Sequence, residues 1–168
     1  DITPETLSAA YARISRDPRP VNELRTAARQ EVEKARKSNR AIIFKMGHHS
    51  VAEHAVFNFD IIGVSRLAIE EIEKFRLCSF TEKSQRYITL DGDYVIPAEI
   101  KGSQLEKDYL AAIKGQNAFY FKLVEKGIVS EDARYITALA TQGQLGLTVN
   151  ARNLELMFRR FASSPMAE

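Results

Sequence analysis

The stretch "AVFNFDIIGV", residues 55–64, decides the class of fold, because it is the clearest strand in a chain whose other patterns are mostly helical. Phe57 and Phe59 alternate with Asn58 and Asp60. A period of two residues is typical of a β-strand, since successive side chains point to opposite faces. We therefore predict a strand here with one buried face.

The segments on either side of this strand predict mostly helices. Apolar periodicity indicates helices over residues 21–38 and 103–126. Helices are also predicted over residues 66–77 and 130–136, with a last helix from Asn150. Two further strands are predicted over residues 84–90 and 144–149. In the longest helix, Ser103 and Glu106 predict a capping box, and Gly127 marks the end. Because helices outnumber strands and do not alternate with them, we expect an α+β fold.

The composition sets limits on the class of protein. With 168 residues, of which 45% are apolar and 27% charged, the chain suits one ordinary globular domain. The net charge of +2 is too small to favour nucleic acid as a partner. Apolar runs such as "AIIF" are too short to span a membrane. A single cysteine, Cys78, permits no internal disulfide, which favours a reducing compartment such as the cytoplasm.

The histidine-rich stretch "GHHSVAEH", residues 47–54, invites a metal hypothesis, because His49 and Glu53 share a face if the segment is helical. The spacing matches no common zinc motif, so we expect no metal. Two alternatives stay open at this point. Either Gly47 ends the preceding helix and the histidines brace the next element, or the stretch forms a polar wall of a ligand pocket.

The stretch "EKFRLCSFTEKSQRY", residues 73–87, combines cations with hydroxyl groups. Its first cations complement the dipole of the helix that they end, which needs no functional explanation. Ser84 and Arg86 lie two residues apart and would share a face on the predicted strand. A hydroxyl and a guanidinium on one face suit a phosphate or a uracil-like edge. Glu82 would then be able to accept a hydrogen bond from the same ligand.

A third polar stretch, "TVNARNLELMFRR", spans residues 148–160. Asn150 and Arg152 stand where a strand gives way to a helix. Asn150 is explained by helix capping alone. Arg152 is not, because a cation in the first turn opposes the helix dipole. Upstream, Arg134 is a candidate for the same pocket or merely a surface charge paired with a neighbouring carboxylate.

In this order and at these separations, the motifs resemble those of the flavin-dependent thymidylate synthases. The segment "GHHSVAEHAVFNFDIIGVSR" is similar to the family's histidine motif and the phenylalanine-rich strand that follows it. The segment "KFRLCSFTEKSQRY" matches in frame a signature of arginine–histidine–arginine followed, after seven residues, by serine–x–arginine–tyrosine. Further similarities are "YARIS", "GIVSEDARYITAL" and "TVNARNLELM", so the resemblance runs from about residue 10 to the end.

The resemblance implies a fold, a reaction and an assembly. The fold is α+β, a single domain over residues 1–168 with helices packed on a mainly antiparallel sheet. The enzymes make dTMP from dUMP, with methylenetetrahydrofolate as carbon donor, NADPH as reductant and FAD as cofactor. No enzyme cysteine attacks the pyrimidine, which agrees with reading Cys78 as a packed thiol. The family forms homotetramers with shared sites, so we expect a homo-oligomer here.

The resemblance also implies site residues at matching positions. Beside FAD it places Ser50, Glu53, Lys74, Phe75, Arg76, Glu82, Asn150 and Arg152. Around dUMP it places Glu71, Lys74, Glu82, Ser84, Arg86 and Arg134. Ser84 and Arg160 are the candidates for catalytic roles.

The chain departs from the family's pattern at three of these positions. Lys74 replaces the first arginine, which keeps the charge but loses the planar fork. Phe75 replaces the histidine and removes a polar group. Glu71 replaces the usual glutamine and adds negative charge near an anionic nucleotide.

A fourth departure lies near the end of the chain. The family's pyrimidine-polarising arginine aligns with Phe161, and Arg160 would replace it only if the last helical turn is re-registered, since one residue turns a helix by roughly 100°. The family continues with a further helix where this sequence ends, so we expect a truncation relative to the family. Two hypotheses follow: a thymidylate synthase, or a non-catalytic family member or half of a duplicated protein that binds flavin or nucleotide and supports an assembly.

Overall fold

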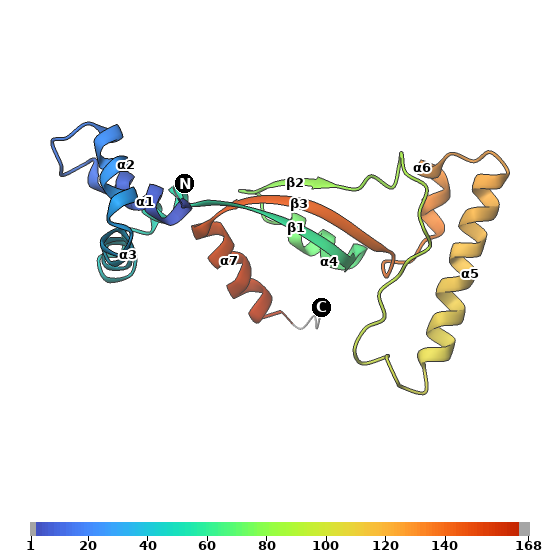
Figure 1. Ribbon diagram of the computed structural model, residues 1–168. Helices are drawn as coiled ribbons and strands as arrows, with labels where there is room; N and C mark the ends of the chain where they lie inside the picture. Colours follow the sequence, from blue (N-terminus) through green and yellow to red (C-terminus); the bar gives the residue numbers. More distant parts are fainter. Residues whose placement is uncertain (1–2, 165–168) are drawn as a thin grey trace. The chain divides into compact units, whose positions relative to one another are not determined.

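The computed structural model describes residues 3–164, and these divide into two compact units (Figure 1). The first unit comprises the residues up to Phe59 together with Leu77–Ser79 and Thr148–Ser163. The second comprises Asp60–Arg76, Phe80–Leu147 and Ser164. The expectation of a single domain over residues 1–168 stays a prediction.

The elements of the described residues follow in chain order. Helices of the first unit are α1 Pro4–Arg13, α2 Val21–Gln30, α3 Val32–Arg40, the π-helical turn η1 Ala41–Lys45, the 3₁₀ helix η2 His49–His54 and α7 Ala151–Ala162. Those of the second are α4 Arg66–Glu73, α5 Glu106–Glu125, α6 Ser130–Ala133 and the 3₁₀ helix η3 Arg134–Ile136. None of these helices is both long and apolar enough to cross a membrane.

The strands β1 Val56–Ser65, β2 Ser79–Glu82 and β3 Gln142–Asn150 form an antiparallel sheet in the order β1, β3, β2. The α+β class is therefore confirmed, and so are the predicted strands that became β1 and β3. The aromatic face of β1 is less buried than predicted, since Phe59 is 38% exposed.

Alanines form the centre of the first unit. Helix α1 packs against α2, α3 and η2, and Ala9, Ala10, Ala28 and Ala35 are fully buried in one cluster. Side chains this short let helices approach closely. The predicted helix over residues 21–38 is wrong in one respect, because the backbone leaves helical geometry at Glu31 and separates α2 from α3.

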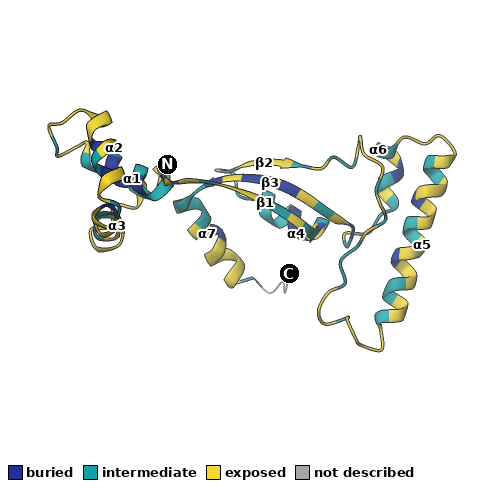
Figure 2. Cartoon of the chain, in the orientation of Figure 1, coloured by how far each residue is buried: buried dark blue, intermediate teal, exposed yellow. Residues whose placement is uncertain are grey.

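The core of the second unit lies where α4 packs on β3. Leu145 and Leu147 are buried on one face of β3, with the exposed Gly146 between them (Figure 2). Ile69 of α4 is fully buried, and a Cβ atom at Gly143 would stand 2.5 Å from its Cδ1 atom. A side chain at position 143 would therefore require the end of the buried Ile69 side chain to shift.

The segment that follows β2 contradicts one prediction. Residues 84–90 form no strand, and β2 has already ended at Glu82. Instead, Ser84 Oγ accepts a hydrogen bond from the backbone N–H of Arg86 at 3.2 Å, which closes a local turn. The two side chains therefore do not lie on one face of a strand.

Helix α5 explains why this segment is ordered without a strand. The Tyr120 hydroxyl accepts a hydrogen bond from Leu90 N at 3.2 Å, and Asn117 Nδ2 donates one to Gly92 O at 2.8 Å. Side chains of α5 thus satisfy backbone groups that a sheet would otherwise pair. Helix α6 packs beside α5 in the same unit (Figure 1).

The start of α5 differs from the predicted capping box. The helix begins at Glu106, three residues later than predicted, and its N-cap Leu105 makes no side-chain cap. The Glu106 carboxylate instead accepts a hydrogen bond from Gly102 N at 2.5 Å, while Ser103 Oγ accepts one from Leu105 N. The same polar residues therefore stabilise the turn before the helix.

Replacing Gly143 with Ala should destabilise the protein by about 1–3 kcal/mol, because the new methyl group would overlap Ile69. The matched control is Gly146→Ala in the same strand, where a Cβ atom would meet nothing within 4 Å. Thermal unfolding followed by circular dichroism measures both. Equal melting temperatures for the two variants would contradict the packing described here.

Candidate functional site

The first group of candidate residues lies in the first unit, where η2 packs against α7. We call Ser50, Glu53, Asn150 and Arg152 the Asn150 junction. Asn150 Oδ1 caps α7 by accepting a hydrogen bond from Asn153 N at 2.9 Å. Arg152 forms an ion pair with Glu53, and both side chains are about half exposed.

The junction explains how a cation is tolerated in the first turn of α7. The guanidinium of Arg152 faces the positive end of the helix dipole, and the Glu53 carboxylate compensates for it. The capping bond uses the oxygen of the Asn150 side chain and leaves its NH₂ group as a donor. The Asn150 junction therefore presents amide, guanidinium, hydroxyl and carboxylate groups on an exposed surface.

The structure supports the bracing hypothesis for one histidine. The His54 ring packs edge to face against Tyr11 of α1, with centroids 4.9 Å apart. Ser8 Oγ of the same helix donates a hydrogen bond to Val51 O at 2.7 Å, and the positive φ of Gly47 (75°) turns the chain after η1. Within residues 3–164, no three His, Cys, Asp or Glu side chains are grouped as metal ligands.

The second group of candidate residues surrounds a cavity in the second unit. The cavity has a volume of about 210 Å³ and is lined by residues of β1, β3 and the segment after β2. Glu82 and Ser84 line it, together with Lys83, Asp91 and Gly143. Two predicted site residues therefore meet in one cavity, although Ser84 lies in a turn rather than a strand.

Arg66 is a residue of this site that the sequence interpretation missed. Its guanidinium forms an ion pair with Glu82 of β2 and a second one, 3.1 Å long, with Glu70 on its own helix. Arg66 and Glu82 are 25% and 19% exposed, so the pair is mostly shielded from water. The hydrogen bond to Glu82 raises the pKa of Arg66. As the first residue of α4, Arg66 carries the same signal that singled out Arg152.

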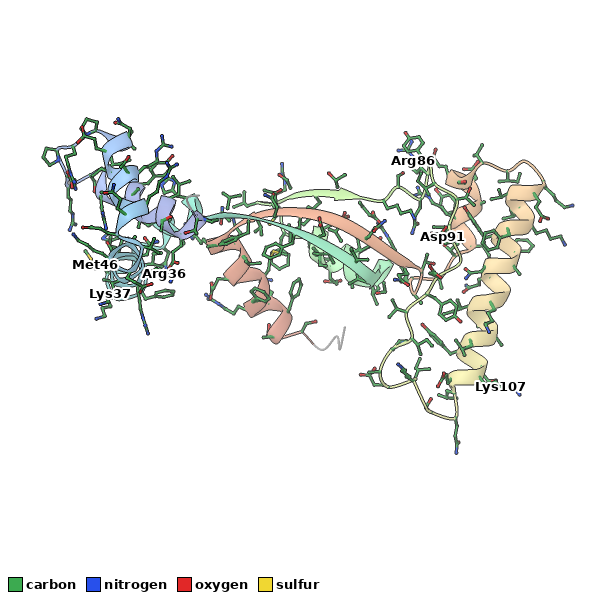
Figure 3. All side chains as sticks on the ribbon, viewed as in Figure 1. Arg36, Lys37, Met46, Arg86, Asp91 and Lys107 are labelled. Atoms are coloured by element: carbon green, nitrogen blue, oxygen red, sulfur yellow. The ribbon has the colours of Figure 1, made fainter. Side chains whose placement is uncertain are left out.

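Arg86 and Arg134 are brought together by Glu131 (Figure 3 shows Arg86 near α6). Arg86 Nε lies 2.8 Å from the Glu131 carboxylate, and Arg134 Nε donates to the Glu131 backbone oxygen at 3.1 Å. Both contacts use Nε, which leaves the terminal nitrogens of each fork to bind an anion. The contact of Arg134 is with the Glu131 backbone, and its role in a pocket stays a prediction.

The remaining candidates of the second unit follow α4. Lys74 is paired with Glu71, so the substituted charge is partly neutralised within the chain. Arg76 is exposed and Phe75 is half-buried. These residues, like Glu71 and Lys74, do not line the cavity.

Two residues bear on the chemistry from α7. Helix α7 is unbroken from Ala151 to Ala162, so Arg160 is not re-registered onto the face of Phe161, and its catalytic role stays a prediction. Met157 Sδ lies 4.0 Å from Cys78 Sγ, and burial raises the pKa of the Cys78 thiol. Both observations support the interpretation of Cys78 as a packed thiol.

The fold is shared with solved structures of nucleotide methylases. A UMP/dUMP methylase PolB from Streptomyces cacaoi, bound to 5-Br dUMP, matches 92% of this chain and 71% of its own at 21% identity, with a TM-score of 0.75. Thymidylate Synthase X from Helicobacter pylori, with FAD and dUMP, matches 99% of this chain and 83% of its own at 20% identity, with a TM-score of 0.71. At these identities the likeness defines the class of fold.

Sequence comparison gives the family. The family model of the thymidylate synthase complementing proteins, Thy1, matches residues 1–168, and the chain belongs to this family. A flavin-dependent thymidylate synthase of Geobacter sulfurreducens is 35% identical over 67% of this chain and 50% of the relative. One of Clostridium tetani is 30% identical over 93% of this chain and 69% of the relative. The chain spans about half the length of the first of these curated relatives.

Replacing Asn150 with Ala should cost about 1 kcal/mol of stability, because the backbone N–H of Asn153 loses its cap. Asn150→Ser is the matched control, since a serine hydroxyl also caps a helix. Chemical unfolding with urea should therefore give a lower midpoint for the alanine variant than for the serine variant. Equal midpoints would show that the cap contributes nothing.

Proposed function

We propose that the chain acts as a flavin-dependent thymidylate synthase, a methyltransferase that makes dTMP from dUMP. Methylenetetrahydrofolate would donate the carbon, NADPH the reducing equivalents, and FAD would be the cofactor. The curated relatives that carry this name support the proposal, as does the fold shared with proteins solved with FAD or dUMP. The observation that carries it is that Glu82 and Ser84, two of the site residues that the family resemblance implies, line one cavity.

The second unit offers the groups that a uridine nucleotide requires. The terminal nitrogens of Arg86 and Arg134 would bind the anionic groups of dUMP bidentately. Glu82 and Ser84 would bind the ring or sugar, and Ser84 would lie beside the reacting centre. Glu71 and Lys74 would complete the nucleotide site as a mutually neutralising pair.

The Asn150 junction fits a flavin by its set of donors. The amide NH₂ of Asn150 and the guanidinium of Arg152 would donate to the acceptor atoms of the ring, and positive charge there would favour a reduced, anionic flavin. Ser50 and Glu53 would add a hydroxyl and an acceptor on η2. Lys74, Phe75, Arg76 and Glu82 belong to the second unit, and their contact with the cofactor is proposed from the family motif. When bound, FAD would supply the redox chemistry.

We expect the protein to work as a homo-oligomer, with a tetramer as in the family. The cavity of about 210 Å³ is smaller than the roughly 300–1,000 Å³ of typical ligand pockets, so one chain holds only part of the site. In the first unit, Phe57, Leu154 and Phe158 line an apolar groove of about 590 Å³. Phe158 is 65% exposed, and a second copy of the chain would bury it. The single cysteine supports a cytoplasmic location.

A second candidate is a non-catalytic family member, or half of a duplicated protein, that binds flavin or nucleotide and supports an assembly. The specific observation in its favour is that Phe75 and Phe161 occupy the positions of two polar family residues. The unbroken α7 offers no local replacement for the second of these.

The purified protein should be yellow and should form dTMP from dUMP, methylenetetrahydrofolate and NADPH with added FAD. The double substitution Phe75→His and Phe161→Arg should raise the turnover of a weakened enzyme, because it restores the polar groups of the family. Transfer of a radiolabel into dTMP measures the turnover of the wild-type protein and of the double variant. Bound flavin without dTMP from either protein would favour the non-catalytic candidate, and a colourless protein that binds no FAD would exclude both.

Replacing Arg86 with Ala should weaken dUMP binding at least tenfold, since a charge-assisted contact with an anion contributes about 1.5–3 kcal/mol. Lys107→Ala is the matched control, because it removes one exposed cation from the far end of α5 in the same unit (Figure 3). Calorimetric titration measures both affinities. If both variants lose the same amount of dUMP affinity, the loss is explained by net charge alone and the proposed contact of Arg86 is contradicted.

A further inference from the structure

The two carboxylate oxygens of Glu82 differ in their hydrogen bonding. Oε2 accepts from Arg66, whereas Oε1 is buried and has no hydrogen-bond partner among the described residues. An unpaired buried acceptor is costly, so this atom calls for an explanation. Oε1 lies 3.9 Å from where a Cβ atom of Gly143 would stand, and both residues line the cavity.

Arg66 does not itself line the cavity. It lies behind Glu82, at the start of α4, and its backbone N–H is fixed by a hydrogen bond to Thr141 O at 2.9 Å. Its guanidinium bridges Glu70 and Glu82, and the Glu82 pair is the more shielded of the two because Glu70 is 52% exposed. The fork therefore constrains Glu82 through Oε2 and leaves Oε1 without a partner among the described residues.

We infer that Arg66 is a positioning residue that holds the Glu82 carboxylate with Oε1 presented to a hydrogen-bond donor of dUMP in the cavity. This inference rests on the proposed function. A carboxylate oxygen only accepts, so the donor is an N–H or O–H group, such as the ring imide or a sugar hydroxyl.

The experiment uses the full chain with FAD added and measures dUMP affinity and melting temperature for Arg66→Met, Glu82→Gln and the double variant. Each single change should weaken dUMP binding about tenfold, the loss of one hydrogen bond to a charged group. Arg66→Met should also lower the melting temperature, because it leaves a shielded carboxylate without its cation. In the double variant the melting temperature should recover while the affinity stays tenfold weaker, no worse than in Glu82→Gln.

Glu70→Gln is the matched control, since it removes the exposed partner of Arg66 and should leave dUMP affinity within about twofold. Arg66→Lys, which keeps a charge that reaches Glu82, should bind dUMP more tightly than Arg66→Met, and it substitutes for the methionine variant if that protein does not fold. Unchanged dUMP affinity on changing Arg66, or affinity that recovers with stability in the double variant, would overturn the inference alone. Failure of the wild-type protein to bind dUMP would overturn the proposed function with it.

Discussion

Each group of candidate residues contains a guanidinium in the first turn of a helix, where it opposes the helix dipole and is paired with a carboxylate of another element. Helices α4 and α7 each begin directly after a strand, capped by Ser65 and Asn150. Each then places an arginine against the positive end of its own dipole. Arg66 is matched by Glu82 of β2 and Arg152 by Glu53 of η2, so each arginine ties its helix to another element.

The two pairs differ in their surroundings, and this difference separates their expected roles. The Arg152 pair is about half exposed, so it adds little to stability and its groups remain accessible to a ligand. The Arg66 pair is mostly shielded, where removal of one partner is costly. The first is suited to contact with a cofactor, and the second to holding a carboxylate in place.

Family membership and chemistry rest on different features of the chain. Membership follows from the match of the Thy1 family model to residues 1–168. Chemistry depends on a few positions. Phe75 and Phe161 remove a polar group at two of them, and Lys74 keeps the charge but loses the planar fork at a third. Because a fold can be kept while its reaction is lost, the dUMP and FAD assignments are tied to the side chains that remain.

Much of the local structure could be predicted from the sequence. The strands that became β1 and β3, most helices, the α+β class and the Asn150 cap follow from periodicity and from capping preferences of single residues. The failures also have physical causes. A strand was predicted over residues 84–90, but the chain there turns at Ser84, and backbone groups of Leu90 and Gly92 pair with Tyr120 and Asn117 of α5. Nothing in the local pattern contains those distant partners.

For the candidate site, too, some features could be predicted from the sequence and others could not. The sequence by itself determined which groups are present, namely the capping amide, the arginines and the signature carboxylate and hydroxyl, because these follow from residue identity and spacing. Only the tertiary structure decided their partners: Glu131 between Arg86 and Arg134, Arg66 behind Glu82, and Gly143 beneath Ile69. The reason is that an ion pair or a close packing contact depends on where two separate elements meet, and spacing along one element does not fix that.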